Sequence, residues 1–161
     1  MFGLDLHPAV VHFPIALAVV GALMELIYML LQRSWVRWFG PVLLTLGLAG
    51  SGVAYFSGNA VHDKAVDQGV PDAAIEKHEQ TCLWALGTLG LATLLSWAVR
   101  TSGRGLWLST IVAIAAAGLT VYTGYLGGEL VYRHGAGRVK AAARAAPSSH
   151  ALPRTTRRGA R

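Results

Sequence analysis

The chain has 161 residues, of which 53% are hydrophobic and only 14% are charged, and its formal net charge is +6. Soluble domains carry about 25% charged residues, so this composition excludes an ordinary water-soluble domain. The excess charge is confined to one end, because eight Arg and Lys residues and no acid lie from Arg133 onward, whereas the six basic and eight acidic residues before it leave −2.

Four apolar runs are long enough to cross the hydrocarbon layer of a membrane, which takes about 20 helical residues. The runs are approximately Phe13–Leu31, Trp38–Ser57, Cys82–Val99 and Gly105–Leu126, and Glu25 is the one charged residue inside them. We therefore predict an all-α integral membrane domain over residues 1–139, followed by a basic tail over residues 140–161. The predicted membrane spans are residues 9–32, 38–60, 79–99 and 105–131.

The first span opens with the stretch HPAVVHFPIAL, which places two histidines and two prolines at its start. We expect a true span rather than a signal peptide, because no basic residue precedes the run and no cleavage motif follows it. Pro14 cannot donate a hydrogen bond to the Val10 carbonyl, so we expect a kink beside His12. His7 and His12 are five residues apart, about 140° around a helix, and are expected to face different partners.

Glu25 lies 13 residues beyond His12, or roughly 20 Å along a helix. This depth is past the middle of the membrane. A carboxyl group there is costly unless it faces the bundle interior, is protonated or reaches the interface. A structural hydrogen bond to another helix and a role in proton handling are the two alternatives.

Short links connect the spans in pairs, with QRSWVR between the first and second and RTSGRG between the third and fourth. Links of this length force antiparallel neighbours, so we predict an up-down four-helix bundle. The polar stretch from Gly58 to Gln80 joins the two pairs. Within it, Asp72 is predicted to cap a short helix after Pro71.

The aromatic residues agree with this topology. Four tryptophans lie at the end of span one, the start of span two, the end of span three and the start of span four, and an up-down bundle brings all four to one interface as an aromatic belt. Three tyrosines lie toward the opposite interface. The tryptophans are Trp35, Trp38, Trp97 and Trp107, and the tyrosines are Tyr122, Tyr125 and Tyr132.

The tail contains no aromatic residue and little to bury beyond alanine, so we predict that it is disordered and attracted to anionic lipid. Nucleic-acid binding is set aside, because basic tails beside membrane spans usually lie on lipid. Cys82 is the single cysteine, which excludes an internal disulfide, and no C-x-x-C-H motif for a c-type haem occurs.

Five histidines fall on the side of the membrane opposite the tryptophans: His7, His12, His62, His78 and His134. Ionisable groups at membrane depth usually mark function, so we expect at least two of these histidines to share a cofactor or a metal ion. Imidazole binds Zn, Cu, Fe and Ni, and haem iron in helical bundles takes histidines from facing helices. If the site holds a transition metal ion, His62 is an additional candidate ligand.

The stretches HPAVVHFPIAL and YLGGELVYRHGAGRV together resemble an uncharacterised family of bacterial four-helix membrane proteins. The resemblance runs from Leu6 to about Val139 and is specific at its two ends. Some members of that family are joined to c-type cytochrome domains, which implies a module for b-type haem or electron transfer. Carried over by position, the resemblance points to four cofactor-binding residues: His7, His12, His78 and His134.

The leading hypothesis is a small membrane redox subunit that binds haem b and exchanges electrons with a quinone or a c-type cytochrome. The alternatives are a metal-binding membrane protein that uses the same histidines, and a structural or partner-binding subunit without a cofactor. Homo-oligomers or larger membrane complexes are compatible with each hypothesis. No phosphate-binding loop, serine-hydrolase elbow or zinc-protease motif points to another enzyme class.

We expect a location in the bacterial inner membrane, with both termini and the histidine face outside. Basic residues near span ends number six on the histidine side and four on the tryptophan side, which by itself favours the opposite orientation. Against this count, the first span has no basic residue before it and two just after it, and the first helix usually dominates. The association with c-type cytochrome domains also implies an external C-terminus.

Overall fold

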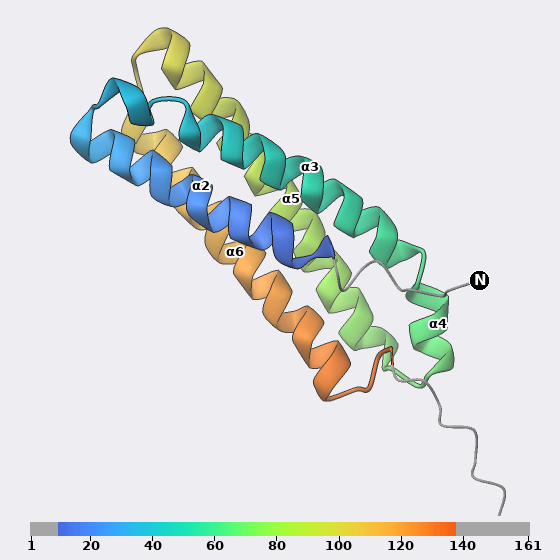
Figure 1. Ribbon diagram of the computed structural model, residues 1–161. Helices are drawn as coiled ribbons and strands as arrows, with labels where there is room; N and C mark the ends of the chain where they lie inside the picture. Colours follow the sequence, from blue (N-terminus) through green and yellow to red (C-terminus); the bar gives the residue numbers. More distant parts are fainter. Residues whose placement is uncertain (1–9, 138–161) are drawn as a thin grey trace, which may run out of the picture.

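The computed structural model describes residues 10–137, so His7 and the predicted tail lie outside the described residues. Four long helices run alternately up and down (Figure 1), which confirms the predicted all-α bundle. All four are long and apolar enough to cross a membrane. They are α2 (His12–Leu31), α3 (Phe39–Asn59), α5 (Asp72–Ser102) and α6 (Leu106–Tyr132).

The four helices form a closed ring in which α2 packs on α3, α3 on α5, α5 on α6 and α6 on α2. Helices α2 and α5 therefore lie diagonally opposite each other. Small residues fill most of the middle of the ring and allow the helix backbones to approach closely, as is usual for helices packed within membranes. The buried core cluster consists of Ala18, Ala22, Leu44, Leu89, Ala92, Ala113, Ala116 and Ala117.

The link between the two helix pairs differs from the prediction. A short helix, α4 (His62–Asp67), follows α3 directly, and the segment from Asp72 onward is the first turn of α5 rather than a separate short helix. Pro71 has an extended backbone with ψ of 129°, so the chain can enter α5 only after it. Asp72 in the first turn favours this start by its charge, and nothing interrupts the helix between Asp72 and the apolar run.

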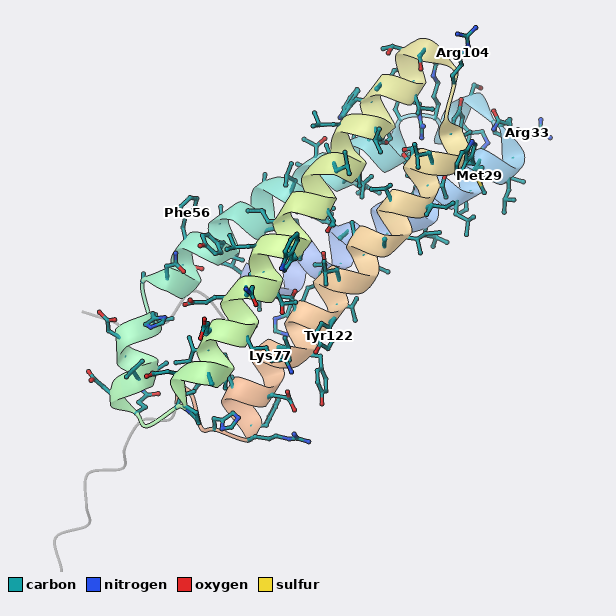
Figure 2. The ribbon with its side chains drawn as sticks, turned by 180° about the vertical axis from the view of Figure 1, so that it is seen from behind. Met29, Arg33, Phe56, Lys77, Arg104 and Tyr122 are labelled. Carbon is teal, nitrogen blue, oxygen red and sulfur yellow. The ribbon has the colours of Figure 1, made fainter. Side chains whose placement is uncertain are left out.

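The four belt tryptophans are all exposed and belong to the two short links and the helix turns beside them. The rings of Trp38 and Trp97 lie 5.6 Å apart, which brings the start of α3 and the end of α5 together. Figure 2 shows Arg33 and Arg104, one from each link, at the same end of the bundle. We call this the tryptophan end, and we call the opposite end, where α2 begins and α6 finishes, the histidine end.

Glu25 joins all four helices near the tryptophan end. Its side chain is fully buried and accepts hydrogen bonds from Ser96 and Arg100 of α5, at 2.5 and 2.8 Å, and from Ser109 of α6 at 3.2 Å. A Cβ atom on Gly40 of α3 would overlap the Glu25 carboxylate, so glycine is required there for the close approach. Of the two alternatives for Glu25, the structure shows the interhelical hydrogen bonds.

Arg100 is the partner that the sequence analysis missed. Its place in the sequence predicts an interfacial link, but the residue is only 3% exposed and its Nη2 atom forms the buried ion pair with Glu25. The Tyr28 ring stacks on its guanidinium group, with 4.2 Å from Cζ to the ring centroid. Arg37 and Arg100 also donate to each other's backbone carbonyls, at 2.5 and 2.7 Å, and so tie the two links together.

Removal of one partner of this ion pair should destabilise the bundle strongly. We predict that Glu25→Ala or Arg100→Ala lowers the free energy of unfolding in detergent by about 3–5 kcal/mol, because each leaves a buried charge uncompensated. The double variant Glu25→Met/Arg100→Met should recover most of the loss, since two apolar groups need no partner.

The control is Glu129→Ala, which breaks the partly exposed i, i+4 pair with Arg133 and should lower the free energy of unfolding by about 0.3–0.5 kcal/mol. If Glu25→Ala lowers the free energy of unfolding no more than Glu129→Ala does, the buried pair does not hold the helices together.

Candidate functional site

Two adjoining cavities open at the histidine end of the bundle. The larger, which we call the inner chamber, has a volume of about 470 Å³, within the range of about 300–1,000 Å³ typical of ligand sites. Residues from α2, α3, α5 and α6 line it, and most of the wall surface is apolar. Its polar side chains are those of His12, Ser51, Tyr55, His78, Cys82, Thr120, Thr123 and Tyr132.

His12 and His78 reach the inner chamber from diagonally opposed helices. His12 is an exposed residue in the first turn of α2, while His78 is half-buried in the second turn of α5. Pro14, two residues after His12, is buried in the first turn of α2, where a helix loses little from a missing N–H. A sulfur contact of 3.5 Å joins Cys82 Sγ to Nε2 of His78, one turn away on the same helix.

Glycines on α6 provide the space for these side chains. A Cβ atom on Gly127 would lie 3.3 Å from Cε1 of His78, and one on Gly124 would lie 2.7 Å from Cδ1 of Ile15. Gly124 therefore allows α2 to approach α6, while Gly127 lets the His78 imidazole lie against the α6 backbone. Gly128, one turn after Gly124 on α6, also lines the chamber.

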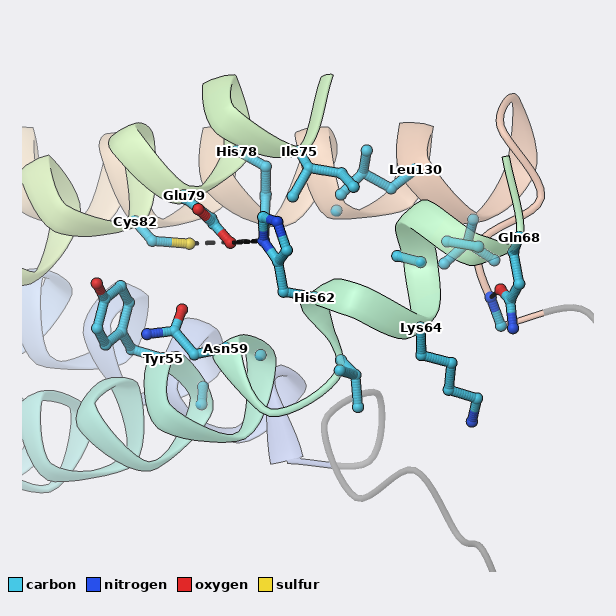
Figure 3. Close-up of a pocket in the computed structure, with 18 residues that line it drawn as sticks. Tyr55, Asn59, His62, Lys64, Gln68, Ile75, His78, Glu79, Cys82 and Leu130 are labelled. Carbon is cyan, nitrogen blue, oxygen red and sulfur yellow. Dashed lines mark hydrogen bonds and ion pairs between the residues drawn. The ribbon is translucent and has the colours of Figure 1, made fainter. Parts of the chain in front are cut away.

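The smaller cavity, which we call the outer chamber, has a volume of about 150 Å³ and lies between α3, α4, α5 and α6 (Figure 3). It contains the 2.6 Å ion pair between His62 Nδ1 and Glu79 Oε1. The pair connects α4 to α5. The two chambers share one wall, made by Ala54, Tyr55, His78, Cys82, Gly127 and Val131.

The pKa of His62 is raised above its ordinary value of 6.5, because Glu79 accepts a hydrogen bond from the imidazolium and attracts its charge. Asp63 and Asp72 add weaker attraction, and partial burial acts in the opposite direction. A raised pKa in the folded state means that the contribution of this pair to stability is complete below pH 6.5 and is lost as the pH rises through the folded-state pKa.

The structure brings only some of the predicted site residues together. His12 and His78 share the inner chamber, and His62 and His78 share the outer chamber. His134 is exposed and lines neither chamber, and His7 lies outside the described residues. Within residues 10–137, no group of three His, Cys, Asp or Glu side chains is arranged to hold a metal ion.

The His-Gly pair at the end of α6 has a structural explanation. Gly135 has a φ of 75°, a left-handed conformation that glycine adopts without strain, and its N–H bonds the Val131 carbonyl at 3.2 Å. The chain then turns so that the N–H of Gly137 donates to Oε1 of Gln68 at 2.7 Å. This part of the motif stops α6 and fastens the chain beside α4.

Comparison with known proteins identifies the family. The family model described as "Predicted membrane protein (DUF2231)" matches residues 3–140, so the chain belongs to this family of membrane proteins of unknown function. No curated protein and no solved structure matches the chain.

The ion pair between α4 and α5 can be tested by titration. We predict that the His62 imidazole titrates above pH 6.5 in an NMR titration of the full chain, and that Glu79→Gln returns its pKa toward 6.5, because the neutral amide no longer attracts the imidazolium. Lys77→Gln, a change on the same turn of α5, is the control. Equal His62 pKa values in the wild type and Glu79→Gln would show that the pair does not form.

Proposed function

We propose that this member of the DUF2231 family is a small membrane redox subunit that binds b-type haem in the inner chamber, where His12 and His78 would hold the haem iron. In this proposal the subunit passes electrons to or from a quinone or a c-type cytochrome. The observation that carries the proposal is that two imidazoles from diagonally opposed helices line one apolar chamber of about 470 Å³. Cofactor sites in helical bundles are commonly built in this way, from side chains on facing helices.

The residues of the chamber fit a haem in three respects. Two imidazoles would be available to bind the iron, most of the wall surface is apolar, and the glycines of α6 leave the His78 imidazole room against the backbone. A metal ion held by protein ligands alone usually needs three or four of them. Among residues 10–137 no such group is found, so the chamber suits haem better than a bare ion.

The haem would supply one-electron oxidation and reduction at its iron. The contribution of the chain is to hold the ring, to exclude water with an apolar wall and so to tune the reduction potential. Cys82 Sγ lies 3.5 Å from Nε2 of His78, so the imidazole would turn away from the thiol in order to bind the iron through this nitrogen. Gly127 also affects the position of the His78 imidazole, because the side chain of any larger residue would press on the imidazole ring.

The test is haem content after expression of the full chain in haem-supplemented cells. We predict that the purified wild type shows a sharp Soret band that shifts on reduction. His12→Ala and His78→Ala should each weaken haem affinity by at least about tenfold, because loss of a ligand should cost no less than loss of its supporting partner. His134→Ala should retain full haem content, because His134 lines neither chamber.

The proposal fails if the wild type contains no haem, or if both His12→Ala and His78→Ala keep the full content with an unchanged spectrum. Loss of haem in His134→Ala alone would place the site elsewhere.

We further propose that the subunit lies in the bacterial inner membrane with the histidine end outside, where a c-type cytochrome could reach it. Arg33 and Arg37 follow the first span and no basic residue precedes it, which supports this orientation. Arg100 is buried, so the tryptophan end presents three surface arginines rather than four, and the bare charge count still favours the opposite orientation. The charges around the first span are given more weight than this count. The test is a pair of reporter fusions to the C-terminus. We expect an alkaline phosphatase fusion to be active. A bright fusion to a fluorescent protein that matures only in the cytoplasm would show the opposite orientation.

A further inference from the structure

The surface of the tryptophan end carries positive charge that no negative charge offsets. Arg33 and Arg37 lie in the link between α2 and α3, and Arg104 lies in the link between α5 and α6. We call these three residues the link arginines. No acidic residue occurs in residues 26–62 or in residues 80–128. Neither link, nor the helix turns beside it, therefore offers the link arginines a surface carboxylate.

The one carboxylate placed toward these links does not compensate them. Glu25 is fully buried and forms its ion pair with Arg100, so this pair adds no net charge to the surface. Figure 2 shows the Arg33 and Arg104 side chains extending away from the ribbon at this end. Within the part of the chain that the structure describes, no carboxylate forms an ion pair with a link arginine. A negative partner must therefore come from outside the bundle.

Arg37 is the link arginine that the fold holds in place. Its Nη2 atom donates to the Arg100 carbonyl at 2.5 Å, and its guanidinium lies over the Trp38 ring, with 5.0 Å from Cζ to the ring centroid. Its Nε atom is buried and has no hydrogen-bond partner within residues 10–137. A charged donor without an acceptor is costly, so the chain leaves this guanidinium short of acceptors. The planar guanidinium group matches phosphate oxygens, which it often binds through two parallel hydrogen bonds.

The belt tryptophans indicate where such a phosphate comes from. Each of the four is at least 41% exposed, and tryptophan rings at a membrane interface lie at the level of the lipid headgroups. The link arginines belong to the same two links, so they lie at the level of the phospholipid phosphates. This placement favours a phosphate that is carried by a lipid over one that is free in water.

We propose that the tryptophan end binds the headgroup of an anionic phospholipid, with Arg37 as the principal phosphate ligand. Arg33 and Arg104 add attraction through their charge, and the exposed tryptophan rings contact the lipid beside the headgroup. Anionic lipids are preferred over zwitterionic ones because the link arginines repel a positively charged headgroup amine. The proposal depends neither on haem nor on the orientation of the chain. In the orientation proposed above, this end faces the cytoplasmic leaflet, whose surface is negative.

The experiment measures lipid preference at the tryptophan end by fluorescence quenching. The full chain is placed in phosphatidylcholine bilayers that contain either phosphatidylglycerol or phosphatidylcholine with brominated chains, and bromine quenches nearby tryptophan. Trp84 lies sixteen residues before Arg100 on α5, or about 24 Å along the helix, so Trp84→Phe in every sample leaves the belt tryptophans as the reporters. We expect the chain to prefer the anionic lipid by at least about fivefold, the factor that corresponds to one arginine near a charged surface.

Two variants test the link arginines, and a third is the matched control. Arg33→Gln/Arg104→Gln changes two exposed side chains, so the bundle should fold and the preference should fall. Arg37→Gln should lower the preference as well, and its thermal unfolding is measured alongside because Arg37 also bonds the Arg100 carbonyl. Arg157→Gln/Arg158→Gln removes the same amount of charge from the C-terminal segment and should keep the wild-type preference.

Inorganic phosphate distinguishes a lipid site from an ion site. At equal ionic strength, phosphate and chloride should weaken the preference for the anionic lipid to the same extent, through screening alone. A preference that phosphate removes and chloride does not would show a site for free phosphate and would overturn the proposal.

Three other results would also overturn it. The first is equal quenching by the anionic and the zwitterionic lipid in the otherwise unchanged chain. The second is an unchanged preference in Arg33→Gln/Arg104→Gln. The third is an equal loss in Arg157→Gln/Arg158→Gln, which would show that net charge rather than the tryptophan end selects the lipid.

Discussion

The ion pair between Glu25 and Arg100 is the constraint on which the rest of the bundle depends. A membrane interior offers no hydrophobic driving force between helices, so the helices must be positioned by close packing and by polar contacts. The Glu25 carboxylate receives hydrogen bonds from α5 and α6 and rests against Gly40 of α3. The buried charge pair therefore joins α2 to α5, and its carboxylate also contacts α3 and α6, so a shift of α2 or α5 would leave a charge without its partner.

The ion pair positions the helices at the tryptophan end, and the histidine end contains the two chambers. Alanine and glycine hold the helices close through the middle. From the level of Glu25, α2 runs only 13 residues to His12, whereas α5 runs 28 residues from Arg100 to Asp72. At 1.5 Å per residue, α5 extends about 20 Å farther. Both chambers lie at this histidine end. Here α5 and α6 extend beyond the first turn of α2, and α4 packs beside them.

The bundle could be predicted from the sequence because apolar length and tryptophan position are local signals. Arg100 was misassigned because it follows an apolar run and precedes a polar link, the usual place of an interfacial arginine. Its four-residue spacing from Ser96, which puts both on one helix face, is the signal that could have identified it.

Glu79 was not predicted for another reason. Its partner His62 lies 17 residues away, and only the turn through α4 brings them together. The chambers depend on packing between four helices, which no sequence pattern reports.

The most direct test of the central claim, that imidazoles from diagonally opposed helices bind one haem iron, is the low-temperature electron paramagnetic resonance spectrum of the oxidised full-length protein. Two imidazole ligands produce a low-spin ferric iron, and we predict that signal for the wild type. A high-spin ferric signal would show that His12 and His78 do not both ligate the iron. The absence of any ferric haem signal from protein purified out of haem-supplemented cells would contradict the haem site altogether.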